Sequence, residues 1–260
     1  MSARTVAIIP ARLASTRFPG KMLACETGRP LVQHVVDAVR RCPGFDGPGA
    51  VVVAADDPSL RDALAGFGTS VVLTASGHAN GTSRLAEAAA LLGLDGDDVI
   101  VNVQGDEPEI EPRAIEAAVT ALARPASPTA RAAHVGTVAT PLVPPDRPED
   151  RNIVKVVRAL DGGALYFSRA PIPCARDGCE SADASPLRHV GLYAYRRRFL
   201  EQYVALPPTP LEGAEQLEQL RVLEHGYRVA VAVVPGLTGT GIDTPEQYRA
   251  FVARHKARGR

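Results

Sequence analysis

Residues 5–21, TVAIIPARLASTRFPGK, set the fold class of this chain, because a short apolar run leads there directly into a loop with three cations. The apolar run is rich in Val and Ile and is typical of a strand that is buried on both faces. Arg12, Arg17 and Lys21 can surround several oxygens of one anion, and Gly20 lets the backbone approach it closely. In open α/β sheets, ligands bind beyond the carboxyl ends of the strands. The segment therefore predicts a polyphosphate site behind the first strand, with a solvated basic loop as the alternative.

The same loop differs from the common phosphate-binding motifs. Pro10 and Pro19 would hold it open rather than let it coil into a helix, and Ser15 would add a hydroxyl donor. Met22 follows Gly-Lys where a Walker A loop has Ser or Thr, and no Gly stands five positions before that Gly. No Gly-x-Gly-x-x-Gly follows the first strand either. A P-loop ATPase and an ordinary dinucleotide-binding protein are therefore disfavoured.

Outward from this loop, strand-like and helix-like segments alternate through the first half of the chain. Expected strands lie at residues 5–9, 50–54, 70–73 and 99–103, and expected helices at 30–41, 58–67 and 82–92. Such alternation predicts an α/β fold with a Rossmann-like, nucleotide-binding, mostly parallel sheet and helices on both faces.

The second half of the chain is less regular and is expected to form a smaller part with some antiparallel strands. Pro-rich connections lie at residues 125–128 and 141–148. Expected strands lie at 134–140, 153–158, 189–195 and 227–234. Expected helices lie at 212–224, with Gly226 placed to end it, and at 244–256, with Thr244 as its cap.

The composition limits the function classes. With 45% hydrophobic residues, the 260-residue chain can bury one substantial core. A net charge of zero and the absence of Trp argue against a nucleic-acid-binding protein, because base stacking needs aromatic rings. The cysteines have neither disulfide nor zinc spacing; they are Cys25, Cys42, Cys174 and Cys179. No apolar run reaches transmembrane length, so we expect a cytoplasmic protein without membrane contact.

Two turns that each carry an Asp are candidates for a metal site. The turn Gln104-Gly105-Asp106 follows the strand expected at 99–103, and Asp243 lies in a Gly-bearing turn before the last helix. Mg²⁺ usually takes one or two carboxylates and completes its shell with water and phosphate oxygens. If both Asp residues converge on the first loop, they would make a metal-triphosphate site. An ordinary turn and a helix cap are the alternatives.

Nine segments, collinear along nearly the whole chain, carry a resemblance to a known family. They are IPARLASTRFPGK (9–21), ADD (55–57), HANGTSR (78–84), VNVQGDEP (101–108), NIVKVV (152–157), ALYFSRAPIP (164–173), RHVGLYAYR (188–196), LEQLRVLEHG (217–226) and GTGIDTPE (239–246). With these segments the chain resembles the 3-deoxy-manno-octulosonate cytidylyltransferases, or CMP-Kdo synthetases. Each segment alone is a weak signal, whereas nine in the same order are highly specific.

The resemblance implies a reaction in which CTP and the acidic sugar 3-deoxy-D-manno-octulosonate (Kdo) give CMP-Kdo and diphosphate for lipopolysaccharide biosynthesis. It also implies Mg²⁺, a homodimer and a fold of the nucleotide-diphospho-sugar transferase type. Residues 1–260 would then form a single nucleotidyltransferase domain. Residues 1–125 would mainly bind CTP, and residues 126–260 would mainly bind the sugar and form the dimer.

The resemblance also assigns roles by motif. The catalytic residues would be Arg12, Lys21, Asp106 and Asp243, of which Asp106 and Asp243 would hold the metal. The nucleotide would be bound by Pro10, Ala11, Arg12, Ser15, Arg17, Lys21, Thr82, Arg84 and Gln104. The sugar would be bound by Arg169, His189, Tyr193, Glu218 and Gln219. Judged alone, the sugar set is equally typical of core side chains on a strand and of a solvated helix face.

One segment departs from the family pattern. The family usually has Ser at position 80 and an acidic residue at 83, where this chain has Asn80 and Ser83. An acidic side chain beside Arg84 would orient its guanidinium, so the loss can loosen nucleotide contacts or change the choice of base.

Other functions remain open at this point. A related cytidylyltransferase could act on another acidic ulosonate, such as 8-amino-Kdo or sialic acid. A catalytically silent nucleotide-binding regulator could use the same fold, although such a protein has less need of a complete set of metal carboxylates and phosphate cations. A retaining glycosyltransferase would not need three cations in the first loop.

Overall fold

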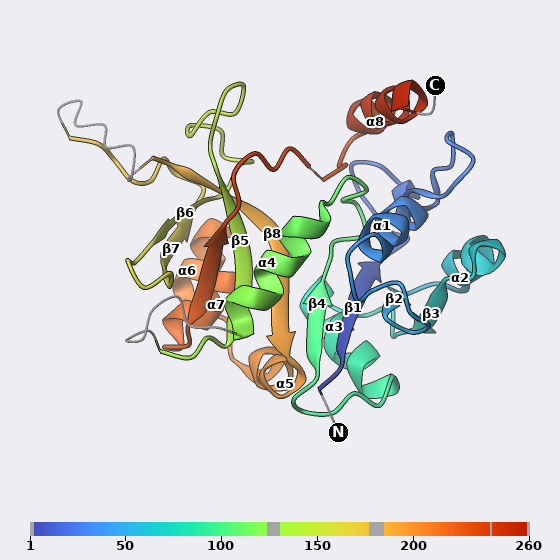
Figure 1. Ribbon diagram of the computed structural model, residues 1–260, viewed down its shortest axis with the longest axis horizontal. Coiled ribbons are helices and arrows are strands. Elements are labelled where there is room, and N and C mark those ends of the chain that lie inside the picture. The colour runs from blue at the N-terminus through green and yellow to red at the C-terminus, as the bar shows by residue number, and fades with distance from the viewer. Residues whose placement is uncertain (1–2, 124–130, 177–184, 240, 259–260) are drawn as a thin grey trace. The chain divides into compact units, whose positions relative to one another are not determined.

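The computed structural model describes residues 3–123, 131–176, 185–239 and 241–258, and Figure 1 labels its elements. Contacts divide the chain into two units. Unit 1 comprises Met1–Pro112 and Thr238–Arg260, and unit 2 comprises Arg113–Leu237. The division of labour predicted for residues 1–125 and 126–260 stays a prediction. Thr240, Cys179 and the whole of the predicted connection at 125–128 lie outside the described residues.

Unit 1 contains a parallel sheet in the order β3-β2-β1-β4. Its strands are β1 (Thr5–Ala11), β2 (Val51–Ala55), β3 (Ser70–Leu73) and β4 (Val99–Asn102). Its helices are α1 (Leu31–Arg40), α2 (Pro58–Leu64), α3 (Gly81–Leu91) and α8 (Pro245–Arg258). α1 and α3 lie on opposite faces of the sheet, as right-handed crossovers require (Figure 1). The predicted α/β class with a mostly parallel sheet is confirmed.

β1 is longer than predicted, because Pro10 and Ala11 continue the strand and pair with Ala54 and Ala55. The expectation that Pro10 holds the loop open is therefore wrong. Even-numbered residues of β1 direct their backbone groups toward β4, as the bond from Val103 N to the carbonyl of Ile8 shows. Pairing with β4 ends at Ile8, so the missing N–H of Pro10 breaks no ladder bond.

The helices of unit 1 begin at residues suited to that position. Asn80 caps α3, since its side chain accepts a hydrogen bond from Ser83 N at 2.9 Å. Thr244 caps α8 in the same way, accepting from Gln247 N. The predicted helix at 58–67 is shorter than expected: α2 ends at Leu64, and one 3₁₀ turn, η2 (Ala65–Phe67), follows.

Unit 2 contains a mixed sheet in which β5 lies between an antiparallel and a parallel neighbour. β5 (Val135–Pro141) pairs antiparallel with β8 (Leu187–Arg196) and parallel with β9 (Val229–Val233). β6 (Lys155–Arg158) pairs antiparallel with β7 (Ala164–Ser168) and with β8. The predicted antiparallel character is confirmed. β7 and two helices, α4 (Pro112–Ala123) and α5 (Arg197–Ala205), were not predicted.

α4 packs directly on β5 at Gly136. A Cβ atom at this position would lie 2.2 Å from the carbonyl oxygen of Ala118 and 2.7 Å from the backbone nitrogen of Leu122. Only glycine allows the helix and the strand to come this close.

The single helix predicted at 212–224 is wrong. The chain forms α6 (Pro210–Glu215) and α7 (Gln219–Glu224), and Gln216 between them has φ 54°, in the left-handed region. The apolar spacing that suggested one helix does not reveal this break. Glu215 is bound by residues at the end of β7, and those long-range bonds hold the chain at the break.

Among the described residues, no helix is long and apolar enough to cross a membrane.

Candidate active site

The strand order of unit 1 marks the position of the site. The chain passes from β1 outward through β2 to β3 and then returns to the other side of β1 to form β4. Such a reversal separates the loop after β1 from the loop after β4. In open α/β sheets, ligands bind in the crevice between two such loops, at the carboxyl ends of the strands. The cationic loop follows β1, and the Gln104-Gly105-Asp106 turn follows β4.

Lys21 lies at the centre of this position. It begins a short 3₁₀ turn, η1 (Lys21–Leu23), directly after Gly20, whose φ is 68°. Its Nζ lies 2.5 Å from Asp106 Oδ2 and 3.2 Å from Asp243 Oδ1, and it donates to the carbonyl of Ile242 at 3.0 Å. Its side chain is only 9% exposed. Both predicted metal ligands therefore converge on one nearly buried ammonium group.

Gly105 brings the turn after β4 against the end of β1. A Cβ atom at Gly105 would lie 2.8 Å from the carbonyl oxygen of Pro10 and 3.2 Å from the sulfur of Met22. A side chain at this position would push the turn away, and Asp106 with it.

Asp243 reaches the site because the C-terminal segment packs on α1. Tyr248, Phe251 and Val252 of α8 form one apolar cluster with Leu31 of α1 and with Ile242. The backbone N–H of Ile242 also donates to the carbonyl of Asp106 at 2.8 Å. Apolar burial and one backbone hydrogen bond thus place a residue from the end of the chain beside the N-terminal loop.

The other two cations of the loop are more accessible. Arg17, whose side chain is 64% exposed, forms an ion pair with Asp243 Oδ1 at 2.9 Å. Arg12 and Ser15 make no hydrogen bond or ion pair with any part of the chain that the structure describes, and Arg12 is exposed. Arg17 is therefore already paired with a carboxylate of the site, while Arg12 and Ser15 have unused donors in the loop that leads to Lys21.

The donor set fits a divalent cation that arrives with phosphates. Asp106 and Asp243 share the ammonium group of Lys21, and Asp243 also pairs with the exposed Arg17. No cluster of three or more His, Cys, Asp or Glu residues suited to a metal occurs in the described residues. A pair of carboxylates is what Mg²⁺ takes when phosphate oxygens and water complete its shell.

The residues predicted for the base meet at the start of α3. The Cβ position of Gly81 lies 3.5 Å from Pro10 Cγ and 4.0 Å from Gln104 Oε1. Thr82, in the first turn of α3, is buried. The end of β1, the turn after β4 and the start of α3 thus meet.

Arg84 is held by residues far from it in the sequence. Its guanidinium donates to Thr74 Oγ1 at 2.6 Å and lies 3.5 Å from Asp56 Oδ2. Asp56 Oδ1 also accepts from Leu13 N at 2.9 Å. Ser83 therefore does not decide how this guanidinium is oriented, because other residues hold it. Sequence reasoning missed the role of Asp56, although ADD at 55–57 was among the matching segments.

Two predicted sugar residues lie together on β8 in unit 2. The rings of His189 and Tyr193 have their centroids 5.5 Å apart. Thr137 Oγ1 lies 2.9 Å from His189 Nε2, and the ring of Phe167 packs edge-on against His189. Burial lowers the pKa of His189 to about 3, so its imidazole is neutral. It can exchange hydrogen bonds with a sugar but cannot neutralise a carboxylate.

The other predicted sugar residues lie at the junction of α6 and α7. Arg169 Nε donates to the carbonyl of Glu215 at 2.8 Å, and its Nη1 donates to the carbonyl of Arg151 at 2.9 Å. Glu218 precedes α7 as its cap residue, and Gln219 is its first residue. Among the five predicted sugar residues, only Arg169 has a side chain with a permanent positive charge.

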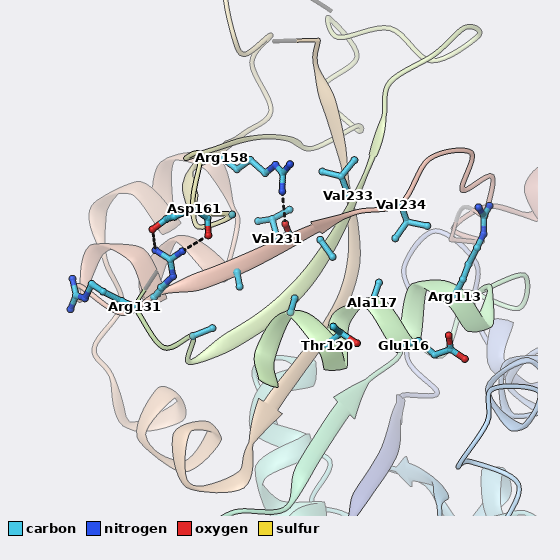
Figure 2. Close-up of a pocket in the computed structure, with 16 residues that line it drawn as sticks. Arg113, Glu116, Ala117, Thr120, Arg131, Arg158, Asp161, Val231, Val233 and Val234 are labelled. Atoms are coloured by element: carbon cyan, nitrogen blue, oxygen red, sulfur yellow. Dashed lines mark hydrogen bonds and ion pairs between the residues drawn. The ribbon is translucent and has the colours of Figure 1, made fainter. Parts of the chain in front are cut away.

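Unit 2 also contains a cavity of about 540 Å³ beside α4, β9 and the β6–β7 turn, shown in Figure 2. Val231, Val233 and Ala117 give it an apolar lining. Arg158 donates to the carbonyl of Val231 at 3.3 Å (Figure 2). Arg228 forms an ion pair with Asp161 at 2.9 Å. No predicted sugar residue lines this cavity.

Comparison with known proteins shows related sequences. The chain matches a cytidylyltransferase family over residues 6–229. A 3-deoxy-manno-octulosonate cytidylyltransferase from Syntrophobacter fumaroxidans is 49% identical, with 96% of each chain covered. One from Leptothrix cholodnii is 47% identical, with 95% of this chain and 90% of the relative covered.

Solved structures agree with the sequence comparison. CMP:2-keto-3-deoxy-manno-octonic acid synthetase in complex with CTP is 36% identical, with a TM-score of 0.86 over 98% of this chain and 100% of that chain. A 4-diphosphocytidyl-2C-methyl-D-erythritol synthase is 15% identical, with a TM-score of 0.59 over 97% of this chain and 98% of that chain, and shares the fold alone.

Proposed function

Because the chain belongs to the 3-deoxy-manno-octulosonate cytidylyltransferase family, we propose the residues through which it carries out that reaction. It is a nucleotidyltransferase that activates Kdo with CTP, giving CMP-Kdo and diphosphate. The observation that supports the residue roles best is the convergence of Asp106 and Asp243 on Lys21 at the carboxyl ends of β1 and β4.

In this proposal, Asp106 and Asp243 hold Mg²⁺ together with the triphosphate of CTP. When bound there, Mg²⁺ would supply positive charge against the phosphate oxygens and would lower the pKa of the attacking hydroxyl of Kdo, so no side-chain base would be required. Lys21, Arg12 and Arg17 bind phosphate oxygens through charge-assisted hydrogen bonds.

Transfer forms a bond from the anomeric oxygen of Kdo to the α-phosphorus and breaks the bond from that phosphorus to the departing diphosphate. Negative charge grows on the diphosphate as it leaves, and Lys21 and Arg12 stabilise it. In the chain alone, Lys21 donates to three acceptors, so it exchanges at least one carboxylate oxygen for a phosphate oxygen when CTP and the metal bind.

The base and the sugar are assigned to different sets of residues. Pro10, Ala11, Gln104, Thr82 and Arg84 bind the cytidine, where the amide of Gln104 can both donate and accept. The acidic sugar is bound by Arg169, His189, Tyr193, Glu218 and Gln219. Because His189 is neutral, the carboxylate of Kdo is assigned to Arg169. A homodimer, a cytoplasmic location and a role in lipopolysaccharide biosynthesis complete the proposal.

The test measures diphosphate release with four nucleoside triphosphates against Kdo, 8-amino-Kdo and sialic acid, with and without Mg²⁺. We expect turnover with CTP and Kdo that depends on Mg²⁺ and is almost lost in Asp106→Asn. The exposed Asp46 provides the control Asp46→Asn, which should keep full activity. Full activity of Asp106→Asn would refute the metal role, and preferred turnover of sialic acid or 8-amino-Kdo would reassign the sugar.

A further inference from the structure

Lys155 is a buried charge that the proposed mechanism does not use. It is 0% exposed and is among the largest fully buried side chains of the described residues. Its Nζ donates to the carbonyls of Ile153 and Arg169, each at 2.6 Å, and to that of Asp150 at 3.0 Å. An ammonium group has three donors, so these carbonyls occupy all of them and leave none for a ligand.

Burying an ammonium is costly, and an apolar side chain of similar length would avoid that cost. This burial lowers the pKa of Lys155 from its usual value. What the charge provides is a junction between two segments, because the loop at residues 150–153 and the backbone of Arg169 both bind to Nζ.

Glu215 holds the other side of the same residue. Its Oε2 accepts from the backbone N–H of Arg169 at 2.9 Å, and its Oε1 accepts from Ser168 Oγ at 2.5 Å. Its backbone carbonyl accepts from Arg169 Nε at 2.8 Å. The left-handed conformation of Gln216 ends α6 here, so that the carbonyls of Glu215 and Gln216 both face the guanidinium.

We propose that Lys155, Glu215 and Ser168 are positioning residues that fix Arg169 as a receptor for the carboxylate of the acidic sugar. Lys155 binds the carbonyl of Arg169, Glu215 binds its amide, and Ser168 orients Glu215. With backbone and side chain both fixed, the guanidinium loses little freedom when the carboxylate binds. This inference rests on the proposed contact between Arg169 and Kdo.

The experiment measures KM for Kdo, KM for CTP and kcat in Lys155→Met, Glu215→Gln and Ser168→Ala. We expect KM for Kdo to rise about tenfold in Lys155→Met and Glu215→Gln and severalfold in Ser168→Ala, with KM for CTP unchanged. Ser168→Thr keeps the hydroxyl and should restore the KM for Kdo that Ser168→Ala loses.

A matched control separates positioning from general stability. Val156 is the buried neighbour of Lys155 on β6, and its side chain points to the opposite face of the strand. Val156→Ala should lower the melting temperature without changing KM for Kdo. If Lys155→Met does not fold, the KM for Kdo of Ser168→Ala and of Ser168→Thr tests the positioning role instead. The inference is wrong if folded positioning variants keep the wild-type KM for Kdo, or if both KM values rise equally.

Arg169→Met distinguishes this inference from the proposed function. If Arg169→Met leaves KM for Kdo unchanged, the contact between Arg169 and Kdo fails, and the inference fails with it. If Arg169→Met raises KM for Kdo while the positioning variants do not, only the positioning role fails.

Discussion

Lys21 connects three segments of unit 1 through one ammonium group. Its partners Asp106 and Asp243 lie 85 and 222 residues further along the chain. Two carboxylates close together repel each other unless a cation lies between them, and Lys21 supplies that cation in the protein alone. In the proposed mechanism, the same charge binds a phosphate oxygen when CTP enters.

Removing this ammonium should therefore change metal binding as well as catalysis. We expect Lys21→Met to lower kcat by two to three orders of magnitude, roughly the effect of losing one strong electrostatic contact in the transition state. In the absence of nucleotide it should bind Mg²⁺ more tightly, because the carboxylate pair has lost its cation. Titration calorimetry with Mg²⁺ tests this, and Arg17→Met, at a well-exposed position, is the control expected to show a smaller change. Weaker Mg²⁺ binding by Lys21→Met would argue against the idea that Lys21 and Mg²⁺ compete for the same two carboxylates.

Asp56 is the residue that sequence reasoning overlooked. It binds the backbone directly after Arg12 and lies beside the guanidinium of Arg84, so it joins the cationic loop after β1 to a residue proposed to bind the nucleotide. We expect Asp56→Asn to raise KM for CTP about tenfold and to leave KM for Kdo unchanged, since the carboxylate charge beside Arg84 is lost. Steady-state kinetics with each substrate in turn measure this.

Its neighbour Asp57 provides a matched control for Asp56→Asn. Asp57 caps α2, accepting from Ser59 N at 2.8 Å, so Asp57→Asn should leave both KM values unchanged. Equal effects of the two substitutions on KM for CTP would contradict the role given to Asp56.

At the scale of elements, glycine decides how closely α4 packs on β5. Because the Cβ position of Gly136 overlaps backbone atoms of α4, a methyl group there must separate the helix from the strand. We expect Gly136→Ala to lower the free energy of unfolding by about 3 kcal/mol, as overpacking of a rigid interface does. Gly213, within α6, has open space at its Cβ position, so Gly213→Ala should instead stabilise slightly. Denaturant titration of both variants checks the difference, and equal effects would contradict the packing argument.

Local sequence patterns were sufficient to predict some helices and strands but not others. The strands of unit 1 and helices α1, α3 and α8 were predicted because apolar runs, caps and Pro or Gly at their ends are local signals. The break at Gln216 was missed because no local signal distinguishes it from a helical position. It depends on Glu215 being bound by Ser168 and Arg169, residues that approach only in the folded chain.

At the scale of the whole molecule, buried histidines make stability depend on pH. Burial lowers the pKa of His189 to about 3, and burial together with His255 lowers that of His34 to about 4, from 6.5 in both cases. Between these values and pH 6.5, the unfolded chain binds protons that the folded chain does not, so stability falls as the pH falls. From pH 6.5 to pH 5, His189 alone should cost about 2 kcal/mol.

Denaturant titrations at pH 7 and pH 5 measure this dependence. His189→Gln should reduce the loss between the two pH values, and His225→Gln, at an exposed position, should not. A loss that is the same in His189→Gln and in the wild type would show that other groups are responsible.

The sequence by itself determined the α/β class, the cationic loop behind β1 and, through nine collinear segments, the family. These are properties of short windows, in which hydrophobic period, turn residues and residue order can be recognised without knowing distant contacts. Only the tertiary structure decided that Lys21 lies between Asp106 and Asp243, that Asp56 holds Arg84 and that Lys155 and Glu215 fix Arg169. The physical reason is that each of these contacts joins residues that are distant in the chain. Hydrophobic burial and backbone pairing bring these residues together when the chain folds. Local sequence preferences therefore do not predict which of them come into contact.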